Sequence, residues 1–436
     1  MRTGIFGLCL AIVSLQASAQ KIAFTEYDLK NGLHVILHQD RSAPVVTTSV
    51  MYHVGSKDEM PGRTGFAHFF EHLLFEGSDN IKRGEFMKLV SMNGGQNNAN
   101  TTQDRTYYFE SFPSNQVATG LWLESERMMH PVINDIGVKT QNEVVKEEKR
   151  LSFDNRPYGN LFSSILSKVY TNHPYHNSLI GSMQDLDAAN LQEFKDFNKK
   201  YYIPNNAVLV VAGDIDIPKT KASIEQYFGP IPAGTPIARR TVTEAPIMHE
   251  IIDTAYDSNI QIPAIVSAYR VPGMTSKEAT ALEMASAVLS QGSSSRLYRK
   301  MVDEKKNSVQ VGSINYLLED YGTYILYAIP NNGTNLDTLD ADINEEVTRL
   351  QNTLISEKEF TKIMNQFENN FISANTKMQG IANNLADAYT FYKNTNHINQ
   401  ELDEIRKVTR QDIQDVARKY MNRNQRVLLY YLPKKS

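Results

Sequence analysis

The sequence predicts an α+β fold of two duplicated domains, each a mostly antiparallel sheet packed with helices. In each half, segments with the β-branched enrichment of strands come first, segments with helical spacing follow, and strands return at the end. That order favours α+β domains with antiparallel sheets. Two distant segments, 194–211 and 413–430, also read alike, each giving a helix end, an Asn-containing turn and an apolar strand.

The distance between these similar segments predicts the domain organisation. Tyr201 and Tyr420 are separated by about half of the chain that follows residue 19, which favours a duplicated domain over a solenoid of short repeats. Chance similarity of helix–turn–strand units is the alternative. A stretch rich in Pro, Gly and Thr separates the halves and reads as a linker. We expect an N-terminal domain, a linker and a C-terminal domain over residues 20–230, 231–248 and 249–436.

Residues 1–19 have the features of a secretory signal peptide. Arg2 opens a short positive region, an apolar run follows, and Ala17-Ser18-Ala19 fits the small-x-small cleavage pattern. A membrane anchor is the alternative, but about eleven apolar residues are too few to span a bilayer, and no later stretch is apolar enough. We therefore expect an exported protein, periplasmic or secreted, with no membrane span after removal of the signal.

Charge and cysteine content exclude several classes of function. The formal net charge is −4, so no basic surface for nucleic acid is expected. The single cysteine, Cys9, lies in the predicted signal peptide. The mature chain is then expected to have no disulfide, no thiolate nucleophile and no cysteine-ligated metal.

One short apolar stretch, "GFAHFFEHLLF", carries two histidines and a glutamate that share a helical face. The spacing predicts a helix capped by Thr64, on which His68, Glu71 and His72 point the same way. Two imidazoles one turn apart can bind one Zn²⁺, and the carboxylate beside them can reach a metal-bound water. The HxxEH order is the inverted zinc-peptidase signature. The alternative is a helix whose polar edge happens to hold two histidines.

A hydrolytic zinc site also needs a third protein ligand and an open coordination position. The segment "TQNEVVKEEKRLSF" offers three glutamates on one predicted helix. Helical phase places Glu148 on the stripe of Val144, Val145 and Leu151, which a helix normally buries, and Glu147 toward solvent. Because a buried carboxylate needs a charge partner, we expect Glu148 to be the third ligand, with Glu147 as the alternative.

These motifs, taken in order, resemble the M16 metallopeptidases, the family of pitrilysin, insulin-degrading enzyme and the mitochondrial processing peptidase. The resemblance rests on HFFEH with Glu148 downstream, on "NGGQNNANTTQDRTYYF", "NHPYHNSLIGS" and "YYIPNNAVLVVAGD", and on "QGSSSRLYRKMVDE" in the second half. It implies a zinc-dependent endopeptidase that hydrolyses peptides or unfolded segments in a clam-shell chamber. It also implies one Zn²⁺ per chain held by His68, His72 and Glu148, with Glu71 as the general base that activates a zinc-bound water.

The resemblance further assigns two residues to the peptide substrate. The segment "NNANTTQDRTYYF" reads as a strand, and in the resembling family this strand is a sheet edge to which the substrate backbone adds. Asn98 and Ala99 match the Asn-Ala of that motif and are expected to contact the peptide. An interior hairpin strand is the alternative.

The second half departs from the metal-binding pattern. Aligning Gly77-Ser78 with Gly292-Ser293 puts Glu283 at the position of His68 and Ala287 at that of His72. We therefore expect a metal-free C-terminal duplicate that forms a wall of the chamber.

The second half also lacks a pair of residues that active members of the resembling family carry there. Those members supply an Arg and a Tyr seven residues apart, whereas this chain has Val302 and Val309. We expect this chain to be the catalytic subunit of a homodimer or heterodimer in which a related subunit supplies the Arg/Tyr pair. The alternatives are a weak or altered peptidase acting alone, and a non-catalytic scaffold or peptide-binding subunit of the same fold.

Overall fold

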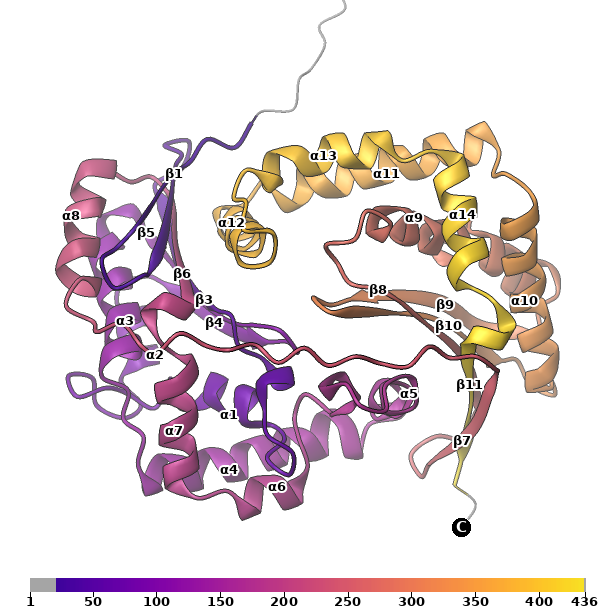
Figure 1. Ribbon diagram of the computed structural model, residues 1–436, viewed down its shortest axis with the longest axis horizontal. Coiled ribbons are helices and arrows are strands. Elements are labelled where there is room, and N and C mark those ends of the chain that lie inside the picture. Colours follow the sequence, from indigo (N-terminus) through magenta and orange to yellow (C-terminus); the bar gives the residue numbers. More distant parts are fainter. Residues whose placement is uncertain (1–20, 435–436) are drawn as a thin grey trace, which may run out of the picture.

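The computed structural model describes residues 21–434 and contains two α+β domains, each built on one sheet (Figure 1). The predicted signal peptide, residues 1–19, lies outside the described residues. The N-terminal sheet has the strand order β1-β2-β6-β3-β5-β4, and every pair is antiparallel except β2 with β6. Its strands are β1 (Thr25–Asp28), β2 (His34–Gln39), β3 (Val45–Tyr52), β4 (Gln96–Thr101), β5 (Thr106–Pro113) and β6 (Ala207–Gly213).

The C-terminal sheet repeats this plan without a counterpart of β1. Its order is β7-β11-β8-β10-β9, and only β7 pairs with its neighbour in parallel. The predicted fold of two similar domains with mostly antiparallel sheets is therefore confirmed. The strands are β7 (Ile251–Asp257), β8 (Ala264–Pro272), β9 (Ser308–Leu317), β10 (Tyr321–Pro330) and β11 (Arg426–Pro433).

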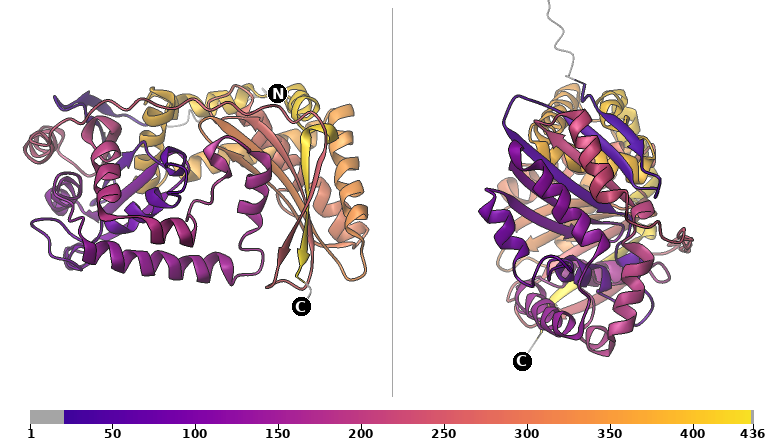
Figure 2. Two further views of the ribbon diagram at one scale, coloured as in Figure 1. Left: turned by 60° about the horizontal axis from the view of Figure 1, so that its bottom comes forward. Right: turned by 90° about the vertical axis from the view of Figure 1, so that its left-hand side faces the viewer.

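Helices occupy the longer intervals between strands in both domains. Among the described residues no helix is both long and apolar enough to cross a bilayer. Between α8 and β7 the chain forms no helix or strand and runs across both domains (Figures 1 and 2). The first domain holds α1 (Phe66–Leu73), α2 (Phe86–Met92), α3 (Val117–Met129), α4 (Asp135–Lys149), α5 (Leu161–Val169), α6 (Met183–Ala188), α7 (Leu191–Tyr201) and α8 (Ile217–Phe228). The second holds α9 (Ala279–Ser290), α10 (Leu336–Asn352), α11 (Glu357–Ala374), α12 (Met378–Tyr392), α13 (His397–Lys407) and α14 (Arg410–Tyr420).

The two domains exchange helices across their interface. Helix α12 of the C-terminal domain packs on β3 and β6 of the N-terminal sheet, where Leu385 and Ala382 join a core with Ile36 and Val210. Helix α5 of the N-terminal domain packs in turn on β8 and β11 of the C-terminal sheet. Figure 1 shows α12 beside the N-terminal sheet and α5 below the C-terminal one. Each sheet thus depends on the other domain to cover one of its apolar faces.

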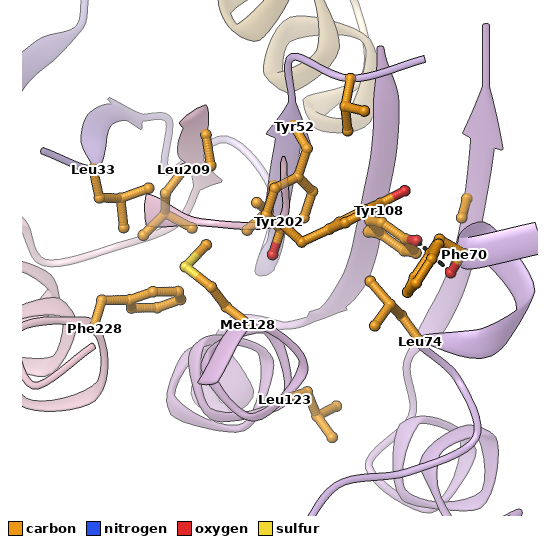
Figure 3. Close-up of a cluster of buried hydrophobic side chains, with 14 of the residues drawn as sticks. Leu33, Tyr52, Phe70, Leu74, Tyr108, Leu123, Met128, Tyr202, Leu209 and Phe228 are labelled. Atoms are coloured by element: carbon orange, nitrogen blue, oxygen red, sulfur yellow. Dashed lines mark hydrogen bonds between the residues drawn. The ribbon is translucent and has the colours of Figure 1, made fainter. Parts of the chain in front are cut away.

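The main core of the N-terminal domain holds α1 in place. Phe70 on α1 and Leu74 just after it pack beside Tyr108 of β5, and Figure 3 shows them in this cluster with Tyr52 and Tyr202. The Tyr108 hydroxyl donates to the carbonyl oxygen of Phe70 at 2.9 Å. Burying such a side chain is worth about 1.5–3 kcal/mol relative to leaving it exposed. The helix is therefore fixed to the sheet along its apolar side.

The tip of the β9–β10 hairpin is bound to the N-terminal domain by several polar contacts, and Lys57 makes three of them. Lys57 Nζ lies 2.9 Å from an oxygen of Asp104, 2.6 Å from Glu319 and 3.2 Å from Asp320. Burial works against ionisation of Glu319, but His53 and Lys57 outweigh it and lower the pKa of that carboxyl to about 2. The hairpin tip is thus held by ionised groups from both domains.

We expect Leu385→Ala in α12 to destabilise the N-terminal domain as well as its own. The substitution leaves a cavity against the N-terminal sheet, and such core truncations cost about 2–5 kcal/mol. Trp122, the only tryptophan, packs against the N-terminal core and reports unfolding of that domain by fluorescence. Ile372→Ala, at an exposed position of α11, is the control and is expected to change stability by less than about 0.5 kcal/mol. If Leu385→Ala left the urea midpoint of the Trp122 fluorescence transition unchanged, α12 would not stabilise the N-terminal sheet and the prediction would be contradicted.

Candidate metal centre

The start of α1 is set by a glycine and by a carboxylate from the preceding loop. Gly65 is the N-cap residue with φ 92°, a left-handed conformation that favours glycine. Glu59 accepts hydrogen bonds from the backbone N–H groups of Gly65 and Ala67, each at 2.9 Å. The prediction that Thr64 caps the helix is wrong, because its hydroxyl donates to Asp185 instead.

Helix α1 turns its histidines away from the core that holds it. Phe66, Phe69, Phe70 and Leu73 are buried in that core. His68 is almost buried and His72 is a quarter exposed, and their ring centroids lie 4.9 Å apart. An i, i+4 pair of imidazoles is thus available beside the core.

Helix α4 brings Glu148 to the two rings. Glu148 Oε2 lies 3.2 Å from His72 Nε2 and 3.6 Å from His68 Nε2. Ligand atoms each about 2.1 Å from one tetrahedral ion lie about 3.4 Å apart, which agrees with these separations. Across residues 21–434 this is the only group of three His, Cys, Asp or Glu side chains close enough to hold a metal. Glu147 is half exposed and binds Arg150 at 3.0 Å, away from the histidines.

The predicted buried stripe on α4 is wrong in two of its three apolar residues. Val145 is fully buried, but Val144 is 43% exposed and Leu151 is 64% exposed. Val145 belongs to the N-terminal core where α4 meets α1, and Val138 packs against that core, so the apolar contact of the helix is narrow. The other side faces solvent, and after Lys149 the chain widens into a π-helical turn that alters the phase. Glu148 therefore faces the histidines beside Val145, not on a buried stripe.

The charge states of the cluster suit metal ligation. Burial, assisted by His72, lowers the pKa of His68 to about 4, so its ring is neutral near neutrality. A hydrogen bond with His72 is the main cause that lowers the pKa of Glu148. Nδ1 of His68 is buried without a hydrogen-bond partner among the described residues. Neutral imidazole and ionised carboxylate are the forms that bind a metal ion, and a small dication such as Zn²⁺ fits this donor set.

Glu71 lies next to this cluster and has a separate partner. The Thr101 hydroxyl donates to Glu71 Oε2 at 2.6 Å. Burial raises the pKa of Glu71, and the Thr101 hydrogen bond and His72 oppose that rise. A carboxylate with a raised pKa, close to a metal site and outside the ligand group, has the properties of a proton acceptor. The sequence motif included Thr101, but no sequence signal showed that its side chain reaches Glu71.

The strand β4 passes beside α1 with one edge unpaired. It is the last strand of the N-terminal sheet, bonded to β5 alone, so the interior alternative does not apply. Asn98 is exposed on this strand, whereas Ala99 is buried.

In the second domain, α9 corresponds to α1 and β9 corresponds to β4. Helix α9 has Glu283 and Ala287 where α1 has its histidines, and no metal-binding group of the described residues includes them.

Comparison with known proteins gives matches along most of the chain. The family model described as "Insulinase (Peptidase family M16)" matches residues 34–183, and "Peptidase M16 inactive domain" matches 188–367. Zinc protease PqqE of Helicobacter pylori is 31% identical over 82% of this chain and 82% of its own. The uncharacterised zinc protease YmxG of Bacillus subtilis is 25% identical over 81% of this chain and 85% of its own.

Solved structures agree with these matches. A protease from Helicobacter pylori has a TM-score of 0.89 and 28% identity, over 94% of this chain and 99% of its own. The periplasmic protease PqqL of Escherichia coli has a TM-score of 0.78 over 95% of this chain but 48% of its own, and at 18% identity it shows the fold alone. The family matches, the PqqE identity and the shared fold establish that the chain belongs to peptidase family M16.

Proposed function

We propose that the protein is a zinc-dependent endopeptidase in which His68, His72 and Glu148 hold one Zn²⁺ and Glu71 is the general base. The supporting observation is the convergence of these three side chains at the spacing of a tetrahedral site, beside a free strand edge. A bound zinc ion would supply a Lewis acid and lower the pKa of water from 15.7 toward about 7.

Glu71 would carry the proton through the reaction. Its position beside the ligand group lets it take a proton from the attacking water and deliver it to the leaving amine. Burial raises the pKa of Glu71, which favours its protonated form between these two steps. Thr101 holds one carboxylate oxygen, so the other oxygen is the one that exchanges the proton.

The substrate would bind as an added strand on β4. An extended peptide can pair with the free edge through its main chain, and Asn98 and Ala99 lie on that strand next to α1. An unfolded segment or a short peptide can adopt this extended conformation, and these are the proposed substrates. Main-chain pairing makes selection tolerant of side-chain identity.

We also propose that the active form contains a second, related subunit or a second copy of this chain. Val302 and Val309 have no polar side-chain atoms, so they cannot steady a peptide or a developing charge as an Arg/Tyr pair would. The match with PqqL, which shares the fold, covers 95% of this chain but 48% of PqqL, so PqqL is about twice the size of this chain. Two chains of this size would together have about the length of PqqL. The name of PqqL as a periplasmic protease also supports export to the periplasm or beyond, together with the predicted signal at residues 1–19.

Removal of a single ligand is expected to release the zinc. Wild-type protein should bind about one Zn²⁺ per chain, and His68→Ala or Glu148→Gln should weaken binding by more than about 100-fold. Glu147→Gln, one position away on the same helix and turned to Arg150, is the matched control and should bind zinc normally. Metal analysis after dialysis and calorimetric titration measure this. Retention of zinc by Glu148→Gln with loss by Glu147→Gln would reverse the assignment.

Glu71→Gln is expected to separate metal binding from catalysis. Loss of the proton acceptor should lower kcat by about 10²–10⁴-fold, with zinc content and KM unchanged. Hydrolysis of a quenched fluorescent peptide by the assembled protein measures both constants. Loss of zinc from Glu71→Gln would show a role beyond that of a base. Peptide binding without hydrolysis by the zinc-loaded wild-type assembly would identify a peptide-binding subunit instead.

The isolated chain is expected to bind zinc yet cleave peptides poorly if a different subunit completes the site. Co-purification from the source cell should then recover a related M16 subunit with the Arg/Tyr pair, and a homodimer should show twice the chain mass by light scattering. Brisk hydrolysis by a preparation that is monomeric under assay conditions would contradict the need for a partner.

A further inference from the structure

We propose that Thr101 is a positioning residue that orients Glu71, and that the turn after β4 holds Thr101 for this purpose. This inference rests on the proposed function, because it assigns the role of a second residue to the same site. The main observation in its support is the 2.6 Å hydrogen bond from the Thr101 hydroxyl to Glu71 Oε2. Thr101 is not one of the three metal-binding side chains. It lies on the buried face of β4 with Ala99, opposite the exposed face that carries Asn98.

The hydrogen bond acts on a flexible side chain. A glutamate has three rotatable side-chain bonds, and its fixation costs considerable rotamer entropy. Within residues 21–434 the Thr101 hydroxyl is the hydrogen-bond donor that the structure gives to the Glu71 carboxylate. With Oε2 engaged, Oε1 remains available for the proton that the reaction moves. Thr101 therefore selects both the rotamer of Glu71 and the oxygen that reacts.

Thr101 can do this because its own position is rigid. It is the last residue of β4, pairs with Thr106 of β5 and is only 8% exposed. A β-branched side chain has few accessible χ1 rotamers, so the hydroxyl direction follows from the strand backbone. A donor on a rigid strand holds a flexible acceptor more accurately than a donor on a loop would.

The turn that follows β4 is braced by both domains. The Thr102 hydroxyl accepts hydrogen bonds from the backbone N–H groups of Asp104 and Arg105, and these bonds close the turn locally. Asp104 is buried and accepts hydrogen bonds from Tyr175 at 2.6 Å and from the backbone N–H of Glu319 at 2.9 Å. Asp104 also forms an ion pair with Lys57. The end of β4, and with it the Thr101 hydroxyl, is thus held by the C-terminal hairpin as well as by its own sheet.

Thr101→Val, which keeps the shape and removes the hydroxyl, tests the proposal. In the assembled, zinc-loaded protein we expect kcat to fall by about 10–100-fold, with KM and zinc affinity within about twofold of wild type. Thr101→Ser keeps the donor and should restore kcat to within about threefold. Thr106→Val is the matched control, because Thr106 is a buried threonine of the same hairpin whose hydroxyl donates to Val54 and not to Glu71.

A second readout does not depend on turnover. Crystal structures of the zinc-loaded proteins should show Glu71 in one orientation in wild type and Thr101→Ser, and displaced or in two orientations in Thr101→Val. An undisturbed Glu71 in Thr101→Val, or an unchanged kcat, would overturn the positioning role. Equal hydrolysis by wild type and Glu71→Gln would instead overturn the proposed function, and the orientation of Glu71 would still decide the role of Thr101.

Discussion

The structure depends on the ammonium group of Lys57, which binds three carboxylates drawn from both domains. Burial opposes its charge, but Asp104 and Glu319 outweigh that effect and raise the pKa of Lys57, so the group stays ionised. Removal of Lys57 would leave the buried carboxylate of Asp104 without this counter-charge, which is far more costly than the loss of a surface ion pair. The cluster therefore fixes the hairpin tip of one domain against the strand turn of the other. That turn is the one that places Thr101 against Glu71.

The exchange of α5 and α12 adds an apolar constraint to this ionic one. Separation of the two domains would expose the sheet face around Ile36 and Val210 to water, along with the matching face of the C-terminal sheet. The hydrophobic cost scales with the area uncovered, and here two cores open at once. If a chamber admits peptides by opening, an opening within the chain would expose both of these shared cores. In the proposed two-subunit form, the chamber could open between subunits without exposing these cores.

Much of this arrangement could be predicted from sequence, because the features concerned are local. Strand and helix periodicity gave the α+β class, and the spacing of His68 and His72 placed two imidazoles one turn apart. The cap of α1 could not be predicted, because Glu59 reaches it through a loop and not through a neighbouring position. The exposure of Leu151 was missed for a similar reason, since periodicity shows which residues share a face but not what covers it. The helix exchange depends on tertiary contacts that no local pattern carries.

The C-terminal domain contributes to the candidate metal centre although none of the three clustered side chains belongs to it. Helix α9 and strand β9 repeat the placement of α1 and β4, but Glu283 and Ala287 offer no second pair of imidazoles. Its contribution reaches the metal centre by contact: the β9–β10 tip binds Asp104 and Lys57, and α12 covers the N-terminal sheet. Glu71, the proposed general base, would then be held in place in part by a domain that carries none of the four proposed zinc-site residues.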